Sequence, residues 1–287
     1  MTENSKLIVV LGPTGVGKTE YALSLAEHYG CPVINADSRQ IYQGIEIGTA
    51  APTQAELARV KHYFVHTLPL DEYYSAAQFE ADVLQLLDEL FKIHPVVVMS
   101  GGSMMYIDAV TKGIDDIPTI EDAVRDELKN RFLTEGIDRL LQELRLLDPV
   151  YYAEVDRKNH KRIIHALEVC YQTGKPYSSF RQNTHKQRPF LIEKIGLRRS
   201  REDLFNRINQ RVDQMMQQGF LEEVKRVYPL RHLNSLNTVG YKELFKVLDG
   251  EWELPMAIER IKKNTRVYDK KQMLWFSKDP KIKWIDL

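Results

Sequence analysis

The chain has 287 residues, of which 43% are hydrophobic and 28% are charged, and this composition is typical of a folded globular protein rather than a disordered one. Lys and Arg together balance Asp and Glu at 40 residues each, so the overall charge gives no general attraction to nucleic acid or to an anionic membrane. The first apolar run, Leu7–Leu11, is too short for a signal-peptide core or a membrane span. We therefore expect a cytoplasmic protein with no membrane partner, and a monomer, because no exposed apolar stripe suggests a partner chain.

The charges are distributed unevenly along the chain. Residues 1–154 hold 12 Lys and Arg against 24 Asp and Glu, whereas residues 155–201 hold 12 against 3 and residues 255–287 hold 9 against 4. A polyanion that docked on the two basic segments would be attracted and oriented. The alternative is a chance clustering of charge on solvated helix faces. Cys31 and Cys170 lie far apart and match no metal-site spacing, which indicates two unpaired thiols in a reducing compartment.

The first hundred residues alternate strand and helix patterns. Leu7–Leu11 is a continuous apolar run of the kind found in strands buried on both faces. A helical pattern over Lys18–Tyr29 follows it and stops at Gly30. Further segments continue the alternation: a strand over Pro32–Ala36, a helix over Ala76–Lys92 and a strand over Pro95–Met99. This order predicts a parallel sheet wrapped by helices.

From about Asp115 helical patterns dominate, and they cover Glu121–Thr134, Asp138–Leu147 and Asn159–Gln172. A strand pattern returns near Leu191–Leu197, and the rest of the chain reads as the helices Arg201–Gln217, Leu221–Val227 and Pro255–Phe276 and the short strand Lys283–Ile285. The predicted fold is α/β, a parallel sheet flanked by helices, with a mostly helical inserted domain. We place the core domain at residues 1–115 and 198–287, and the helical insertion at 116–197.

A phosphate-binding loop follows the first strand. The segment fits G-x-x-x-x-G-K-[ST] and lies between a buried strand and a helix, the context that this motif requires. Its backbone N–H groups would converge on an anion, and the helix N-terminus would reinforce them. The residues predicted to bind a diphosphate or nucleotide are Gly12, Pro13, Thr14, Gly15, Val16, Gly17, Lys18 and Thr19. Lys18 would add a charge, and the Thr19 hydroxyl would be the metal ligand that holds Mg²⁺.

The loop alone does not name the reaction. Most P-loops bind ATP or GTP, which favours a nucleotide-binding kinase or NTPase, and such enzymes usually have a buried strand that ends in an acidic residue for Mg²⁺. The strand Pro95–Met99 ends in Ser100-Gly101-Gly102-Ser103 instead, whereas Asp37 follows the strand Pro32–Ala36. Both strand ends should open onto the same crevice as the P-loop. Asp37 is then a candidate Mg²⁺ ligand or general base, or a cap for the next turn.

The remaining motifs resemble those of the tRNA dimethylallyltransferase family, in the family's order and over nearly the whole chain. They are Asn35-Ala36-Asp37-Ser38-Arg39-Gln40-Ile41-Tyr42, Gly48-Thr49-Ala50, Ser100-Gly101-Gly102-Ser103-Met104-Met105-Tyr106, Arg162 with Ala166-Leu167-Glu168-Val169, Thr173-Gly174-Lys175-Pro176, Arg207 with Arg211, Met215 and Gly219, Val239-Gly240-Tyr241-Lys242-Glu243, and Thr265-Arg266 with Lys270-Lys271-Gln272 and Trp275-Phe276. An ordered set of this size is far more specific than the P-loop alone.

The resemblance implies a prenyltransferase reaction. A dimethylallyl group moves from dimethylallyl diphosphate to the exocyclic amine of the adenosine 3′ of the anticodon, in tRNAs that read codons beginning with U. The P-loop would then hold the leaving diphosphate rather than ATP, and Mg²⁺ is the implied cofactor. Asp37, Lys18, Thr19 and Arg211 would be catalytic, with Asp37 as general base toward the amine. The anticodon stem-loop of tRNA is the implied partner.

The resemblance also implies a P-loop NTPase-like catalytic core at residues 1–115 and 198–287, a tRNA-binding insertion at 116–197 and a set of RNA contacts. Residues expected to contact the target base, its neighbours or the surrounding tRNA are Asp37, Ser38, Arg39, Gln40, Ser103, Arg125, Lys161, Arg162, Ile163, Ile164 and His165. Three positions depart from the family: Ala51 stands where a lysine is usual, His165 where a second arginine is common, and Ser103 where threonine is commoner. The first two departures concern RNA contact rather than chemistry, and Ser103 keeps the hydroxyl. A small-molecule kinase that uses ATP and a non-catalytic, nucleotide-gated RNA-binding protein are the alternative functions.

Overall fold

A computed structural model describes residues 5–182 and 185–287. The chain forms two compact units: unit 1 comprises Met1–Thr111 and Gln187–Leu287, and unit 2 comprises Lys112–Lys186. Within the described residues, no helix combines the length and the apolar character needed to cross a bilayer.

Unit 1 is built on a six-stranded sheet with the order β3-β2-β4-β1-β5-β6. The strands are β1 (Lys6–Leu11), β2 (Val33–Asn35), β3 (His62–Tyr63), β4 (Val96–Gly101), β5 (Leu191–Arg198) and β6 (Ile282–Asp286). All neighbouring strands are parallel, and β1 pairs with both β4 and β5. Because β1 is central and covered on both faces, its sequence is a continuous apolar run. The predicted parallel sheet is confirmed.

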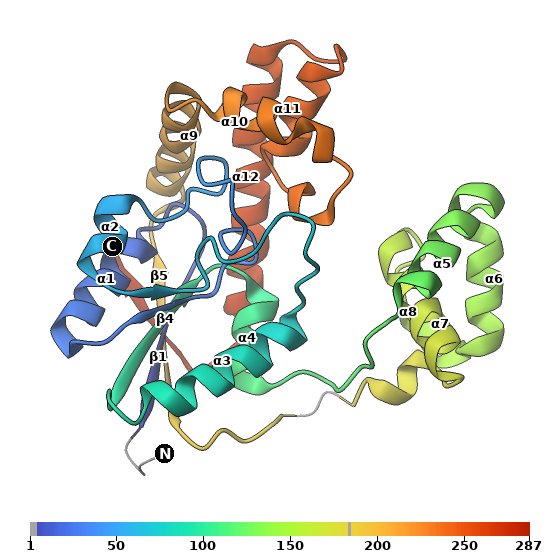
Figure 1. Cartoon of the computed structure of the whole chain (residues 1–287), viewed down its shortest axis with the longest axis horizontal. Helices are drawn as coiled ribbons and strands as arrows, with labels where there is room; N and C mark the ends of the chain where they lie inside the picture. Colours follow the sequence, from blue (N-terminus) through green and yellow to red (C-terminus); the bar gives the residue numbers. More distant parts are fainter. Residues whose placement is uncertain (1–4, 183–184) are drawn as a thin grey trace. The chain divides into compact units, whose positions relative to one another are not determined.

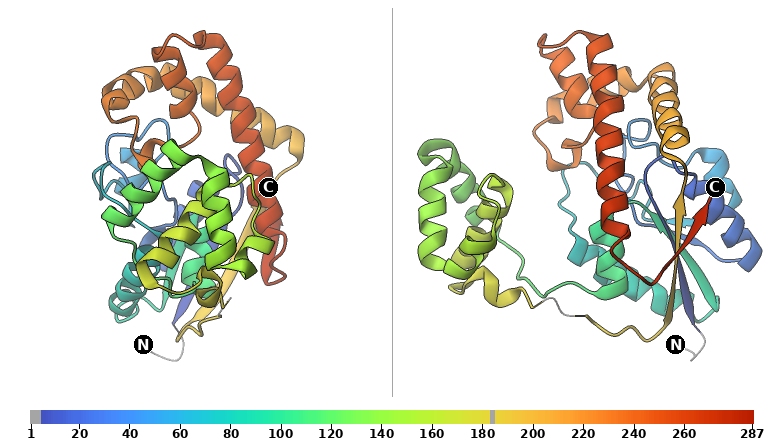
Figure 2. Two further views of the ribbon diagram at one scale, coloured as in Figure 1. Left: turned by 90° about the vertical axis from the view of Figure 1, so that its right-hand side faces the viewer. Right: turned by 180° about the vertical axis from the view of Figure 1, so that it is seen from behind.

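Helices cover both faces of this sheet, and alternate residues of β1 contact different layers. Leu7, Val9 and Leu11 pack with α3 (Ala76–Leu90), α4 (Met104–Lys112) and the C-terminal end of α12 (Leu254–Phe276). Val10 packs on the other face with α1 (Lys18–Tyr29) and α9 (Arg201–Gln217). Helix α12 runs alongside the sheet, and the chain then turns back into β6 beside β5 (Figure 2).

A second group of helices in unit 1 lies beyond the carboxyl ends of the strands (Figure 1). We call this group the helical cap; it consists of α10 (Phe220–Val227), α11 (Tyr241–Leu248), the C-terminal half of α9 and the N-terminal half of α12. Its core contains Phe220 and Tyr241, both fully buried, together with Ile45 from the segment after β2. The short helix α2 (Gln54–Arg59) follows that segment. The cap therefore encloses the edge of the sheet at which the P-loop lies.

Unit 2 is a small helical bundle with a core of its own. Its helices are α5 (Asp122–Glu135), α6 (Ile137–Leu147), α7 (Pro149–Glu154) and α8 (His160–Thr173), followed by a 3-10 helix over Tyr177–Phe180. The fully buried carboxylate of Asp148 accepts hydrogen bonds from the Tyr151 amide (3.0 Å), the Ser178 amide (2.6 Å) and the Ser178 hydroxyl (2.7 Å). This carboxylate caps α7 and ties the 3-10 helix to the bundle.

The structural boundaries of the insertion differ from the predicted ones. The sequence places the insertion at residues 116–197, whereas the compact unit runs from Lys112 to Lys186. The difference at the C-terminal side arises because β5 pairs with β1 along its length, so this strand belongs to the sheet. A short apolar strand pattern does not reveal which sheet it joins.

Candidate active site

The P-loop, Gly12–Thr19, joins β1 to α1, as the sequence predicts. Gly12 (φ 149°) and Gly17 (φ 112°) adopt conformations that disfavour side chains. A Cβ atom on Gly12 would lie 2.6 Å from the carbonyl oxygen of Leu197, so the loop approaches the end of β5 too closely for another residue. The fully buried Val16 side chain packs in the core and anchors the loop.

Three side chains from distant parts of the sequence fix the backbone of the loop. Gln272 of α12 accepts a hydrogen bond from the Thr14 amide (3.0 Å). Arg207 of α9 donates to the carbonyl of Gly15 (2.9 Å), and Arg199 donates to the carbonyl of Val16 (2.9 Å). The loop is thus held in a fixed shape before any ligand binds, which favours anion binding by its amides.

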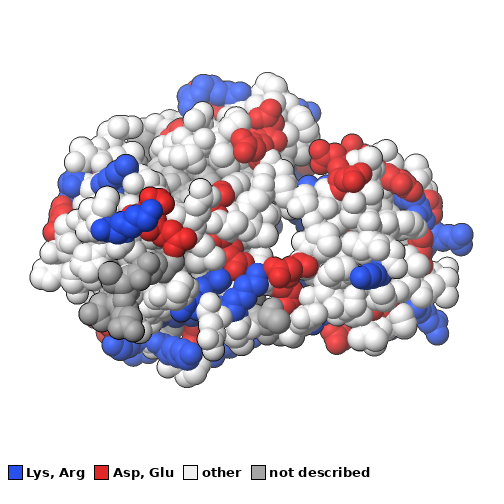
Figure 3. All heavy atoms as spheres, turned by 60° about the horizontal axis from the view of Figure 1, so that its bottom comes forward, with Lys and Arg blue, Asp and Glu red and all other residues white. Residues whose placement is uncertain are grey.

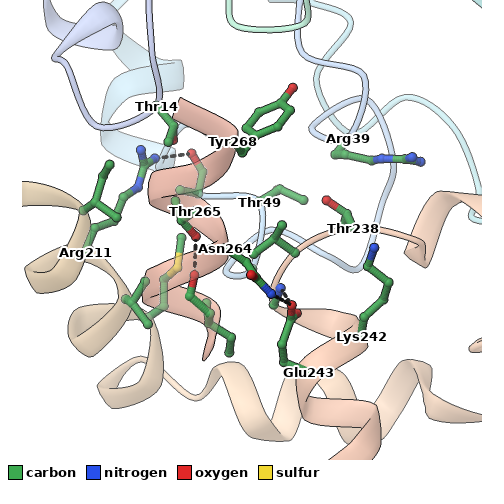
Figure 4. A pocket seen from close by; sticks show the side chains of 18 of the residues that line it. Thr14, Arg39, Thr49, Arg211, Thr238, Lys242, Glu243, Asn264, Thr265 and Tyr268 are labelled. Carbon is green, nitrogen blue, oxygen red and sulfur yellow. Dashed lines mark hydrogen bonds between the residues drawn. The ribbon is translucent and has the colours of Figure 1, made fainter. Parts of the chain in front are cut away.

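Two cavities meet at this loop. The P-loop cavity has a volume of about 460 Å³ and is lined by Gly15, Gly17, Lys18 and Thr19 along with the ends of β2 and β4. The cap cavity has a volume of about 500 Å³ and is lined largely by the helical cap (Figure 4). Both volumes fall in the range of small-molecule sites. The two cavities adjoin, because they share the lining residues Thr14, Asp37, Thr49, Arg211 and Tyr268.

Two partly buried cations, Lys18 and Arg211, line the P-loop cavity. Burial and the nearby Arg211 lower the pKa of Lys18 to about 8, although Asp37 and Asp269 act in the opposite direction. The Lys18 ammonium donates to the carbonyl of Pro13 (2.7 Å). Burial likewise lowers the pKa of Arg211, whose guanidinium donates to the carbonyl of Ala50 (3.2 Å). Arg207 also lowers the pKa of Arg211, whereas Asp37 and Glu56 act in the opposite direction. Partly desolvated cations with like charges nearby form a site that a multiply charged anion would stabilise.

Asp37 follows β2 and lines both cavities. Its Oδ1 accepts hydrogen bonds from the amides of Arg39 (2.9 Å) and Gln40 (3.3 Å), so the expected turn-capping role is present. Across the part of the chain that the structure describes, Oδ2 has no hydrogen-bond partner. One carboxylate can therefore hold the turn with one oxygen and accept a proton with the other.

The other predicted residues of this turn support the cavity walls. Ser103, only 8% exposed, accepts a hydrogen bond from the Ser38 amide (2.8 Å) and donates to the Ser38 hydroxyl (3.1 Å). Arg39 donates to the carbonyls of Asn234 (2.9 Å) and Ser235 (3.2 Å). Ser38, Arg39 and Ser103 line the cap cavity, and Gln40 lines the P-loop cavity.

The residues near Thr19 fit a magnesium ion. Thr19 is exposed in the first turn of α1 and lines the P-loop cavity together with Asp37. Among residues 5–182 and 185–287, no group of three or more His, Cys, Asp or Glu side chains could form a protein cage for a metal. Mg²⁺ is commonly held by one or two protein ligands plus phosphate oxygens and water, and this donor set matches that pattern.

The predicted RNA-contacting residues of unit 2 differ in accessibility. Lys161 and Arg162 are exposed at the start of α8, and His165 is partly exposed with its Nδ1 3.2 Å from Glu168. The Ile163 side chain is fully buried in the core of unit 2, so an RNA contact by this side chain is excluded in this conformation. Ile164 also packs against that core, and Arg125 lies partly buried on α5. Of the predicted RNA-contacting residues in unit 2, Lys161 and Arg162 are thus the exposed lysine and arginine.

The part of the basic segment that returns to unit 1 serves the fold. Its basic side chains pair with carboxylates from elsewhere in unit 1: Arg188 with Glu80 (2.6 Å), Lys194 with Asp279 (2.7 Å) and Arg198 with Asp286 (2.7 Å). For residues 187–201 the charge pattern therefore does not indicate a docking surface. Acidic and basic side chains are interspersed on the face shown in Figure 3.

Asp269 is a buried acid that interacts electrostatically with Lys18 and that the sequence interpretation did not single out. It lies on α12, is 3% exposed, and its Oδ1 lacks a hydrogen-bond partner within the described residues. Burial raises the pKa of this carboxyl to about 6, while Lys18 and Lys270 oppose the shift. In the sequence it is one of two acids, with Glu259, in a helix rich in lysine and arginine, and no local pattern sets it apart.

We expect Asp269→Asn to stabilise the protein at alkaline pH. A carboxyl whose pKa rises from 3.8 in the unfolded chain to about 6 in the folded protein destabilises the fold as pH rises through this window, by up to about 3 kcal/mol. Denaturant unfolding of wild type and variant at pH 4 and pH 8 measures the effect. The variant's advantage should grow by up to this amount between the two pH values, and an equal advantage at both would rule out a titrating Asp269.

Comparisons with known proteins identify the relatives of this chain. The sequence pattern of the family described as IPP transferase matches residues 40–279. The chain is 62% identical to tRNA dimethylallyltransferase 2 of Parabacteroides distasonis, over 98% of this chain and 94% of that protein. It also superposes on the full-length tRNA isopentenylpyrophosphate transferase of Bacillus halodurans, with a TM-score of 0.70, 34% identity and coverage of 98% and 90% of the two chains.

A further solved structure is that of a eukaryotic dimethylallyltransferase acting on tRNA. Its TM-score to this chain is 0.79 at 25% identity, and the match covers 98% of this chain and 74% of that one. The matches in sequence and in structure span nearly the whole chain, as did the ordered motifs. The chain therefore belongs to the IPP transferase family.

Proposed function

We propose that this protein is a tRNA dimethylallyltransferase. It transfers a dimethylallyl group from dimethylallyl diphosphate to the exocyclic amine of the adenosine 3′ of the anticodon, in tRNAs reading codons that begin with U. The observation that carries the proposal is the pair of adjoining cavities, with Lys18 in the P-loop cavity and with Arg211 and Asp37 in the wall common to both. Relatives named tRNA dimethylallyltransferase support the same reaction.

The P-loop cavity receives the diphosphate. As the allylic C–O bond breaks, its electron pair stays with the leaving diphosphate, so negative charge grows on the oxygens nearest the loop. The loop amides, Lys18 and Arg211 stabilise that charge. Thr19, with Asp37 nearby, would hold a Mg²⁺ ion, which would supply further charge neutralisation.

The cap cavity receives the dimethylallyl group and the adenine. Its apolar wall suits an uncharged isoprenoid and a flat base and is formed by Ile208, Val212, Met215, Phe220 and Ile261. The base must leave the anticodon-loop stack to enter, as in other base-modifying enzymes. As the C–N bond forms, the amine proton passes to the free oxygen of Asp37. The cap limits access of water, which would otherwise hydrolyse the allylic centre.

Unit 2 contributes contacts to the rest of the tRNA. Lys161 and Arg162, exposed at the start of α8, would bind phosphates, while His165 and Arg125 make further contacts. Ser38, Arg39, Gln40 and Ser103 shape the entrance for the target base and its neighbours. We further propose that the protein acts as a monomer in the cytoplasm, where its tRNA substrate is found.

Incubation of the protein with unmodified tRNA, dimethylallyl diphosphate and Mg²⁺ tests the proposal. After digestion of the tRNA to nucleosides, mass analysis should show adenosine that carries one isoprenoid unit. A parallel reaction receives ATP in place of dimethylallyl diphosphate and should leave the tRNA unchanged. Absence of prenylated adenosine, together with phosphoryl transfer from ATP to a small acceptor, would instead support a kinase.

A further inference from the structure

Glu223 is a buried carboxylate that the proposed mechanism does not use. It lies on α10 and is 0% exposed, among the apolar residues of the helical cap. A carboxylate in such surroundings is costly unless strong hydrogen bonds compensate for the lost water. A carboxylate at the centre of the cap therefore indicates hydrogen-bond donors that it holds in place.

The partners of Glu223 are two backbone amides and a phenol. Its Oε2 accepts a hydrogen bond from the amide of Ile47 (2.8 Å), and its Oε1 accepts from the amide of Gly48 (2.8 Å). The Tyr241 hydroxyl donates to Oε1 (2.6 Å). Burial and the adjacent Glu223 raise the pKa of Tyr241, so the phenol remains a donor. In all three contacts an N–H or O–H donor faces the carboxylate, and hydrogen bonds to a carboxylate are stronger than those between neutral groups.

The segment held by these bonds, residues 47–50, contributes to the cavity walls, and Gly48, Thr49 and Ala50 line the cap cavity. Thr49 lines each of them. The carbonyl of Ala50 accepts hydrogen bonds from Arg211 (3.2 Å) and from Gln40 (3.0 Å), and Ala50 itself has a positive φ of 48°. A non-glycine residue in this conformation is held there by its surroundings.

The segment also fits tightly against the cap. A Cβ atom on Gly48 would lie 2.2 Å from the Phe220 ring and 2.5 Å from the Tyr241 hydroxyl, so only glycine can pass here. A continuous chain of contacts links Glu223 to the site. The carboxylate holds the amides of Ile47 and Gly48, and two residues later the carbonyl of Ala50 accepts a hydrogen bond from the guanidinium of Arg211.

We infer that Glu223 is a positioning residue that acts through the segment 47–50 to aim Arg211 at the diphosphate. Its carboxylate fixes the two amides, and the fixed chain presents the Ala50 carbonyl that holds the guanidinium. The identity of the anion as a diphosphate rests on the proposed function. A shift of a catalytic group by about 1 Å can reduce a rate about 10²-fold, so a residue remote from the reacting atoms can have a large effect.

The test is a double-mutant cycle between Glu223→Gln and Arg211→Ala, measured on the dissociation constant of Mg²⁺–inorganic diphosphate. The glutamine keeps the shape of the side chain but turns an amide donor toward a backbone donor. Alone, Glu223→Gln should weaken diphosphate binding about 10-fold and lower kcat about 10- to 100-fold. In the Arg211→Ala background it should change neither quantity further. Equal effects in both backgrounds would overturn the inference.

Two further variants keep the test decisive. Tyr241→Phe removes one of the three hydrogen bonds and should give a smaller loss that also vanishes without Arg211, which serves if Glu223→Gln fails to fold. Glu80→Gln weakens a buried ion pair with Arg188 on the opposite side of the sheet from α9 and should lower the melting temperature but leave diphosphate binding unchanged. Wild-type turnover with tRNA is measured in parallel, so failure of prenyl transfer is distinguished from failure of this inference.

Discussion

Replacement of Asp37 by asparagine is expected to lower kcat for prenyl transfer by about 10²- to 10⁴-fold, the range for loss of a general base. Asparagine keeps the Oδ1 acceptor for the Arg39 and Gln40 amides, so the turn should persist. It has no basic oxygen to take the amine proton. The exocyclic amine of adenine is a weak nucleophile, because its lone pair is delocalised into the ring, and it depends on this proton acceptor.

Single-turnover kinetics with saturating dimethylallyl diphosphate measure the effect of Asp37→Asn. The binding of inorganic diphosphate and the melting temperature should stay close to wild type, because the fold and the cations are intact. Asp37→Ala, which also removes the turn cap, should be at least as slow. A rate for Asp37→Asn equal to that of wild type would show that Asp37 is not the base.

Replacement of Lys18 by alanine is expected to lower kcat by roughly 10²- to 10³-fold, the usual cost of removing one preorganised group that stabilises developing negative charge. Lys18 is desolvated beside the P-loop, where its charge acts in a medium of low polarity. After loss of this group, Arg207 and Arg211 still line the P-loop cavity, so part of the charge stabilisation should persist. Diphosphate binding should weaken as well, because the ground-state anion contacts the same ammonium.

The matched control for Lys18→Ala is Lys225→Ala. Lys225 is an exposed lysine on α10 that pairs with Glu222 (2.7 Å) and lines neither cavity, so its loss should leave kcat and diphosphate binding unchanged. Both variants remove one positive charge, which separates a local effect from a change in net charge. Unimpaired turnover by Lys18→Ala would mean that the P-loop does not hold the leaving group.

The local part of this site could be predicted from the sequence. The helix over Lys18–Tyr29 has the bounds that the pattern indicates, and the P-loop lies between β1 and α1 as expected. Asp37 lies at the end of β2 and lines the cavities, because parallel strands direct their carboxyl ends to one edge. Such features depend on residues close together in the chain, so the spacing of apolar residues and the positions of glycines are enough to predict them.

The supports of the site could not be predicted, because they join segments far apart in the sequence. Gln272 contacts the amide of Thr14, and Glu223 contacts the amides of Ile47 and Gly48. No local pattern distinguishes these side chains from ordinary helix residues. The short helix α11 and the membership of β5 in the sheet were missed for a related reason, since both depend on which partner the segment packs against.

The central claim is that the P-loop holds a departing isoprenoid diphosphate and no nucleotide is consumed. The most direct test is the stoichiometry of the reaction with purified tRNA, dimethylallyl diphosphate and Mg²⁺ in the absence of ATP and GTP. We predict that inorganic diphosphate appears in equal amount to prenylated adenosine, and that added ATP remains intact. Steady hydrolysis of ATP, with the tRNA chemically unchanged, would contradict the account.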